Sequence, residues 1–183
     1  MTALLRFDSV ACRRGGRLLF EDVDLELEAG DALLVTGPNG SGKSSLIRLA
    51  AGLLRPERGR VASTPLALAD DSLALDRELP LAKALRFWGG DVDSAMAALG
   101  LFDLEHVPVR LLSAGQARRA SLARVVASGA PLWLLDEPAN TLDSASVQRL
   151  AAMIERHRET GGAVLAASHM TLPGDWRSLE LGR

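Results

Sequence analysis

The chain has 183 residues, of which 48% are hydrophobic and 24% are charged, and its formal net charge is −2 at pH 7. This composition is typical of a folded domain that can bury a sizeable core, and it excludes a disordered chain. The small acidic excess argues against a nucleic-acid binder, which usually carries a basic surface. Cys12 is the single cysteine, which excludes a disulfide within the chain and a cysteine-based metal cluster.

No apolar run approaches the roughly 18 residues of a membrane-spanning helix. Arg6 and Asp8 interrupt the apolar stretch near the start, which argues against a signal peptide. We therefore expect a soluble protein that contacts a membrane only through its partners.

The first third of the chain predicts strands around a glycine-rich loop. Residues 4–10 are a plausible strand, and residues 21–31 alternate apolar and acidic side chains, as in an antiparallel strand with one solvated face. The continuous apolar run 32–36 predicts a buried central strand. A helix is expected over 44–54, and residues 61–68 can supply another short strand.

The rest of the chain alternates helices and strands after a segment of different character. Residues 70–112 predict an inserted helical subdomain, with helical pieces near 80–88 and 93–99. Further helices are expected at 115–127 and 144–158, and strands at 132–136, 163–168 and 176–181. The alternation predicts a single α/β domain over 1–183, with a mainly parallel sheet, helices on both faces and an antiparallel edge region. The catalytic core of this domain would comprise residues 1–69 and 113–183.

A phosphate-binding loop is predicted between the strand 32–36 and the following helix. The segment GPNGSGKSS matches G-x-x-x-x-G-K-[ST] in this strand–loop–helix context, which an ordinary glycine-rich turn lacks. We expect Lys43 to reach the β- and γ-phosphates of a nucleoside triphosphate and Ser44 to offer its hydroxyl to Mg²⁺. The nucleotide-binding set is Gly37, Pro38, Asn39, Gly40, Ser41, Gly42, Lys43, Ser44 and Ser45.

Two carboxylates follow the apolar strand 132–136 in LWLLDEP. Asp136 is expected to hold Mg²⁺ through water, and Glu137 to act as the general base on the attacking water. Such a base contributes about 10²–10⁴-fold to the rate. An Asp-Glu pair after an apolar strand is more often a turn at the end of that strand. Beside a phosphate loop, however, the catalytic interpretation is favoured.

A histidine ends the apolar strand 163–168. We expect this strand to lie alongside the strand that carries Asp136, so that His169 can reach the γ-phosphate. His106 and His157 are expected to be structural, with His157 on a solvated helix face. Arg118, Arg119 and Arg124 are also expected on a solvated helix face, with phosphoryl stabilisation by one of them as the alternative.

These motifs, with the segments LSAGQ (112–116) and TLD (141–143), resemble the nucleotide-binding subunits of ATP-binding cassette (ABC) transporters over nearly the whole chain. The resemblance implies an ATPase in which ATP lies between two head-to-tail copies, so that binding closes the dimer and hydrolysis reopens it. The segment 140–143 would cross the dimer interface. The residues that contact the other copy's triphosphate would be Ser113, Ala114, Gly115 and Gln116.

The chain departs from this family at three points. Ala114 stands where glycine is commonest, so the turn must tolerate a Cβ. The aromatic residue that stacks on adenine is missing near the start, where Arg13 or Arg14 is the candidate to replace it. The glutamine between the phosphate loop and LSAGQ is also missing, and Asp70 or Asp71 is expected to bind Mg²⁺ through water instead.

Within the family, the chain looks like the ATPase subunits of the haem exporters that serve cytochrome c maturation in bacteria. The segments LRFW (85–88), PLWLLDEPANTLD (131–143) and WRSLELGR (176–183) carry this resemblance. It implies a peripheral protein on the cytoplasmic face of the inner membrane, with integral membrane permease subunits as partners. Trp88 would face such a partner or pack in the core. The alternatives are the ATPase of another small exporter, a soluble ABC ATPase, and a binding module without hydrolysis.

Overall fold

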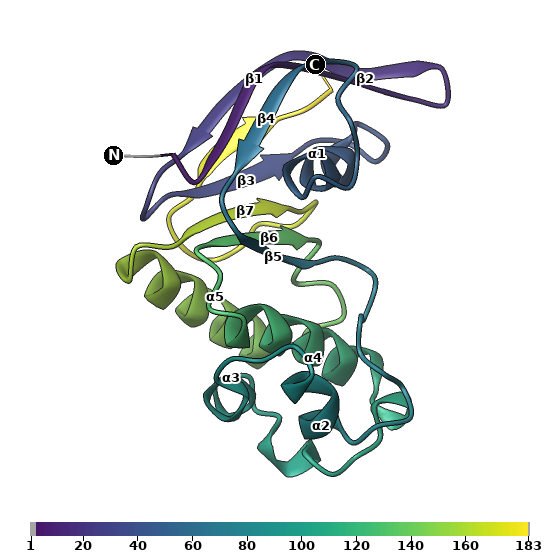
Figure 1. Ribbon diagram of the computed structural model, residues 1–183, viewed down its shortest axis with the longest axis vertical. Helices are drawn as coiled ribbons and strands as arrows, with labels where there is room; N and C mark the ends of the chain where they lie inside the picture. The colour runs from purple at the N-terminus through teal and green to yellow at the C-terminus, as the bar shows by residue number, and fades with distance from the viewer. Residues whose placement is uncertain (1–2, 183) are drawn as a thin grey trace.

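The computed structural model describes residues 3–182, which form two sheets with helices packed around them (Figure 1). One sheet has three antiparallel strands in the order β2-β1-β4, and the other has five strands in the order β5-β6-β7-β3-β8. The strands are β1 (Leu5–Arg14), β2 (Arg17–Leu27), β3 (Ala32–Thr36), β4 (Arg58–Ser63), β5 (Leu66–Ala69), β6 (Leu132–Asp136), β7 (Ala163–Ala167) and β8 (Arg177–Glu180). The helices are α1 (Lys43–Ala50), α2 (Leu81–Arg86), α3 (Val92–Ala98), α4 (Ala114–Ala127) and α5 (Ser144–Glu159).

Every strand pair in the five-stranded sheet is parallel, as the alternation of strands and helices predicts. Strand β2 has one solvated face, as its alternating apolar and acidic residues predict. Val23, Leu25 and Leu27 are buried, and the side chains between them are exposed. The predicted α/β class with an antiparallel region is therefore confirmed.

The parallel sheet separates two hydrophobic clusters. In β6, Leu132 and Leu134 point to the cluster that includes α1 and the antiparallel sheet, whereas Trp133 and Leu135 point to the cluster that includes α4 and α5. This division follows from the two-residue period of a strand. Helices thus cover both faces, which is why the central strands consist of continuous apolar residues.

The segment 70–112 contains α2, α3 and two 3₁₀ helices, Phe102–Leu104 and Val109–Leu111. Helices α2 and α3 pack against α4 at the lower end of the molecule in Figure 1. The division into a core and an inserted helical subdomain stays a prediction, and the packing on α4 supports it.

Residues 61–68 do not form one strand as expected. The chain pairs with β1 as far as Ser63 and joins the parallel sheet only at Leu66. Pro65 lies between the two strands, and because proline has no N–H it cannot continue a ladder of hydrogen bonds. One apolar run therefore supplies a strand to each sheet.

The expectation that Arg118, Arg119 and Arg124 lie on a solvated face of α4 is wrong. Arg118 and Arg119 are half-buried and donate hydrogen bonds to backbone carbonyls of other segments. Arg124 donates to the carbonyl of Leu68 at 2.5 Å, and its guanidinium lies 4.7 Å from the ring centroid of Trp88. The arginines point inward because α4 lies between the parallel sheet and α2 and α3, where strand ends and loops offer free acceptors.

The expectation for His157 also changes, because this side chain is half-buried rather than solvated and its ring stacks on Trp133 with centroids 3.8 Å apart. Cys12 is fully buried. Within residues 3–182, no helix combines the length and the apolar character needed to cross a membrane.

Candidate active site

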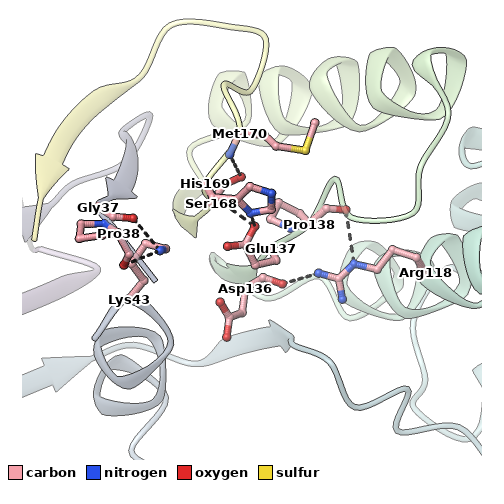
Figure 2. A network of polar contacts seen from close by, with 10 residues as sticks. All are labelled: Gly37, Pro38, Lys43, Arg118, Asp136, Glu137, Pro138, Ser168, His169 and Met170. Carbon is pink, nitrogen blue, oxygen red and sulfur yellow. Dashed lines mark hydrogen bonds and ion pairs between the residues drawn. The ribbon is translucent and has the colours of Figure 1, made fainter. Parts of the chain in front are cut away.

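The glycine-rich loop between β3 and α1 forms a cradle closed by Lys43. The Nζ of Lys43 donates to the carbonyls of Gly37 at 2.8 Å and Pro38 at 3.3 Å, and the side chain is only 7% exposed (Figure 2). Gly37 has φ +136°, and a Cβ there would lie 2.3 Å from the carbonyl oxygen of Leu181. Gly42 provides no side-chain cap for α1, which leaves the helix N-terminus available to an anion.

Asp136 ends β6 beside this loop with its carboxylate largely buried. The residue is 8% exposed, and its Oδ1 is buried without a hydrogen-bond partner among the described residues. Burial raises the pKa of Asp136, while the nearby hydroxyl of Ser44 acts in the opposite direction. An unpaired buried carboxylate oxygen next to a hydroxyl fits a Mg²⁺ ion.

The described residues also fit the way in which Mg²⁺ binds in nucleotide sites. Mg²⁺ is usually bound by one or two carboxylates together with substrate phosphates and waters. Asp136 and Ser44 can supply the protein's share of such a site.

Glu137 turns away from its neighbour because its backbone is left-handed. Its φ is +49°, a conformation that costs a non-glycine residue about 1–3 kcal/mol. Its N–H donates to the carbonyl of Ala167 at 2.8 Å, which fixes the residue to the end of β7. The side chain then points to His169, whose Nδ1 lies 2.8 Å from Oε2 of Glu137 (Figure 2).

The pairing of Glu137 with His169 was not expected, although the adjacency of their strands was. β6 and β7 are parallel neighbours, and Asp136 lies opposite Ala167. Glu137 is therefore one residue past the end of β6, and His169 is two residues past the end of β7. Both residues lie just beyond the ends of two neighbouring parallel strands, and this shared edge of the sheet is the signal that could have found the contact.

The segment 112–116 starts α4 with a capping box. The N–H of Gln116 donates to Oγ of Ser113 at 3.3 Å, and the N–H of Ser113 donates to Oε1 of Gln116 at 2.8 Å. One N–H that was expected to bind the other copy's triphosphate is thus used within the chain. Ala114 begins the helix without a positive φ, so its Cβ is tolerated. A Cβ on Gly115 would lie 2.9 Å from the carbonyl oxygen of Thr141.

A cavity of about 440 Å³ joins these parts within one chain. Ser44, Asp136 and Glu137 line it together with Ala114 and Ala117 of α4. Asp70 and Asp71 also line it, and a carboxylate oxygen of Asp71 lies 4.0 Å from the guanidinium of Arg48.

A second cavity of about 370 Å³ surrounds the phosphate loop. Asn39, Gly40 and Lys43 line it, together with Arg14 and Leu19. Arg13 is committed elsewhere, because it bonds the carbonyl of Gly16 and lies 3.6 Å from Glu57. Of the two arginines considered for the nucleobase, only Arg14 borders the cavity.

Comparison with known proteins agrees with this geometry. Residues 20–140 match the ABC transporter family. A cytochrome c biogenesis ATP-binding export protein CcmA of Sphingopyxis alaskensis is 59% identical over 180 residues, covering 94% of this chain and 93% of that protein. The corresponding protein of Zymomonas mobilis is 51% identical, covering 98% and 85%.

Solved structures agree on the fold. A putative ABC transporter ATP-binding protein from Pyrococcus furiosus superposes with a TM-score of 0.85 at 19% identity, covering 97% of this chain and 96% of that chain. An ATP-binding subunit of an ABC transporter gives 0.83 at 21% identity, covering 91% and 80%. The chain belongs to the ABC transporter family, as one of its ATP-hydrolysing subunits and in the group of the cytochrome c biogenesis ATP-binding export proteins.

Proposed function

We propose that the chain hydrolyses Mg²⁺-bound ATP to power a haem exporter in cytochrome c maturation. The observation that supports hydrolysis is the pair of carboxylates at the end of β6. Asp136 has a buried Oδ1 without a hydrogen-bond partner among the described residues, beside the phosphate loop, and Glu137 is turned to His169. The names of the relatives support the process that the ATPase serves.

The roles of the residues follow from their surroundings. The loop backbone and Lys43 hold the triphosphate, Ser44 and Asp136 hold Mg²⁺, and Glu137 accepts the proton of the attacking water. Mg²⁺, when bound, offsets the negative charge of the phosphates. His169 keeps Oε2 of Glu137 in one orientation by hydrogen bonding, and its position beyond β7 suits contact with the γ-phosphate.

The nucleobase would rest on Arg14 and Leu19, which border the cavity around the phosphate loop. A guanidinium plane can stack on a base, and it does so without the hydrogen-bond pattern that distinguishes one base from another. Weak selectivity between ATP and GTP follows from this arrangement.

The partners would be a second copy of the chain and integral membrane permease subunits. Phe87 and Trp88 follow α2 and are 81% and 46% exposed, which argues against core packing for Trp88. Exposed aromatic side chains of this kind are common where a protein meets a partner. Contact with the inner membrane, on its cytoplasmic face, would then be made through the permease.

Replacement of Glu137 by glutamine tests the proposed hydrolysis. Glu137→Gln keeps the shape of the side chain but cannot accept a proton, so ATP binding should persist while turnover falls by about 10²–10⁴-fold. A phosphate-release assay and a nucleotide titration measure the two effects. Glu159→Gln, at the exposed end of α5, is the control and should behave as wild type. Wild-type turnover in Glu137→Gln would contradict the proposed role.

A further inference from the structure

Arg118 connects three segments that meet at the active site. Its guanidinium donates to the carbonyl of Asp70 at 2.5 Å, to that of Pro138 at 3.4 Å, and to that of Asp136. Asp70 follows β5, and Asp136 ends β6. Arg118 itself lies on α4, one turn after Ser113. All three acceptors are backbone groups, so the side chain acts on the course of the chain rather than on a particular partner side chain.

Two of these carbonyls flank Glu137 (Figure 2). The guanidinium bonds the residue before Glu137 and the residue after it, and Glu137 between them holds the left-handed φ of +49°. Such a conformation persists only where the surroundings fix the backbone on both sides. The N–H of Glu137 is held separately by the carbonyl of Ala167.

We infer that Arg118 is a positioning residue for hydrolysis: it holds the backbone on both sides of Glu137, so that the carboxylate points to His169 and the attacking water. This inference rests on the proposed role of Glu137 as the base. It also links the start of α4 mechanically to the base, because Arg118 follows the capping box of that helix. Movement of α4 against β6 therefore moves the base.

A lysine cannot replace Arg118 in this role. A guanidinium presents its donors in a rigid planar fork, whereas an ammonium is a compact charge on a flexible stem. Arg118→Lys keeps the positive charge that Asp136 and Asp70 favour, but it cannot reach three carbonyls in fixed directions. The variant thus separates geometry from charge.

The experiment compares turnover with nucleotide binding in the 183-residue chain, alone and together with the proposed permease subunits. In Arg118→Lys, we expect turnover to fall by about 10- to 100-fold, the usual cost of misplacing a catalytic group by about 1 Å. The Kd for ATP should stay within about twofold, because the hydrogen bonds of Arg118 within residues 3–182 go to Asp70, Asp136 and Pro138 rather than to the phosphate loop. Arg119→Lys is the matched control: among the described residues, Arg119 bonds the carbonyls of Leu99 and Gly100, away from Glu137, and its variant should keep wild-type turnover.

A second variant, Arg118→Met, and the melting temperature of each variant distinguish a loss of turnover from a loss of the fold. Arg118→Met removes all donors and should lower turnover at least as far as Arg118→Lys, again with retained nucleotide binding. The inference is overturned if Arg118→Lys turns over as wild type, or if affinity and turnover fall together. It is equally overturned if both variants lose the fold while Arg119→Lys keeps it. Glu137→Gln distinguishes the two proposals: if that variant is inactive while Arg118→Lys is active, only the present inference fails.

Discussion

At the scale of single residues, the backbone gives two adjacent carboxylates different surroundings. Asp136 is still in the strand and is buried, which raises the pKa of its carboxyl group. Glu137 is left-handed and faces the exposed side of the site, where His169 is its partner. The proposed metal ligand, Asp136, and the proposed base, Glu137, can therefore act one residue apart without competing for one position.

Lys43 offers a test at the same scale. Lys43→Ala removes the proposed charge-assisted donor to phosphate, and such a bond contributes about 1.5–3 kcal/mol. We therefore expect the Kd for ATP to rise by roughly 10- to 100-fold. Titration with a fluorescent ATP analogue measures it. Lys83→Ala, on the exposed side of α2, is the control. An unchanged Kd in Lys43→Ala would contradict the proposed role of Lys43 in binding the triphosphate.

At the scale of elements, α4 contacts two parts of the molecule. Its start carries the capping box of Ser113 and Gln116 and borders the cavity that also contains Asp136. Its inward face donates arginine hydrogen bonds to strand ends and loops. We expect a helix held at so many backbone acceptors to move as a rigid body, which suits the proposed contact of its start with nucleotide.

Substitutions at Ser113 test the start of α4. Ser113→Ala removes the cap and should lower the free energy of unfolding by about 1 kcal/mol. Ser113→Arg also loses the cap, but its long side chain should obstruct the other copy and reduce ATPase activity far more than alanine does. Thermal melts and phosphate release measure the two effects, and nucleotide binding by the monomer should be unaffected. Equal ATPase rates in the two variants would contradict contact with a second copy.

At the scale of the whole molecule, the equilibrium between monomer and proposed dimer should depend on the bound nucleotide. A nucleotide that binds two copies at once stabilises the closed dimer, and hydrolysis removes that stabilisation. The Glu137→Gln variant with ATP and Mg²⁺ should therefore elute as a dimer in size-exclusion chromatography. The same variant with ADP serves as the control and should elute as a monomer. Scattering that reports only single chains under both conditions would count against the dimer.

Local sequence determined much of this molecule. The phosphate loop is a contiguous motif between β3 and α1, and the buried strands β6 and β7 are continuous apolar runs whose bounds follow from composition. In each case the physical cause acts within a few residues along the chain, so the sequence alone predicts the element and its position.

Tertiary structure decided what depends on the meeting of distant segments. The contact of Glu137 with His169 requires the register of β6 against β7, and the position of Arg14 requires the antiparallel sheet to lie beside the phosphate loop. Arg118 is expected on a solvated helix face from the sequence, yet it binds carbonyls 18 to 48 residues away. Which acceptors a long side chain reaches is set by packing, because backbone groups at strand ends become available only where the sheet stops.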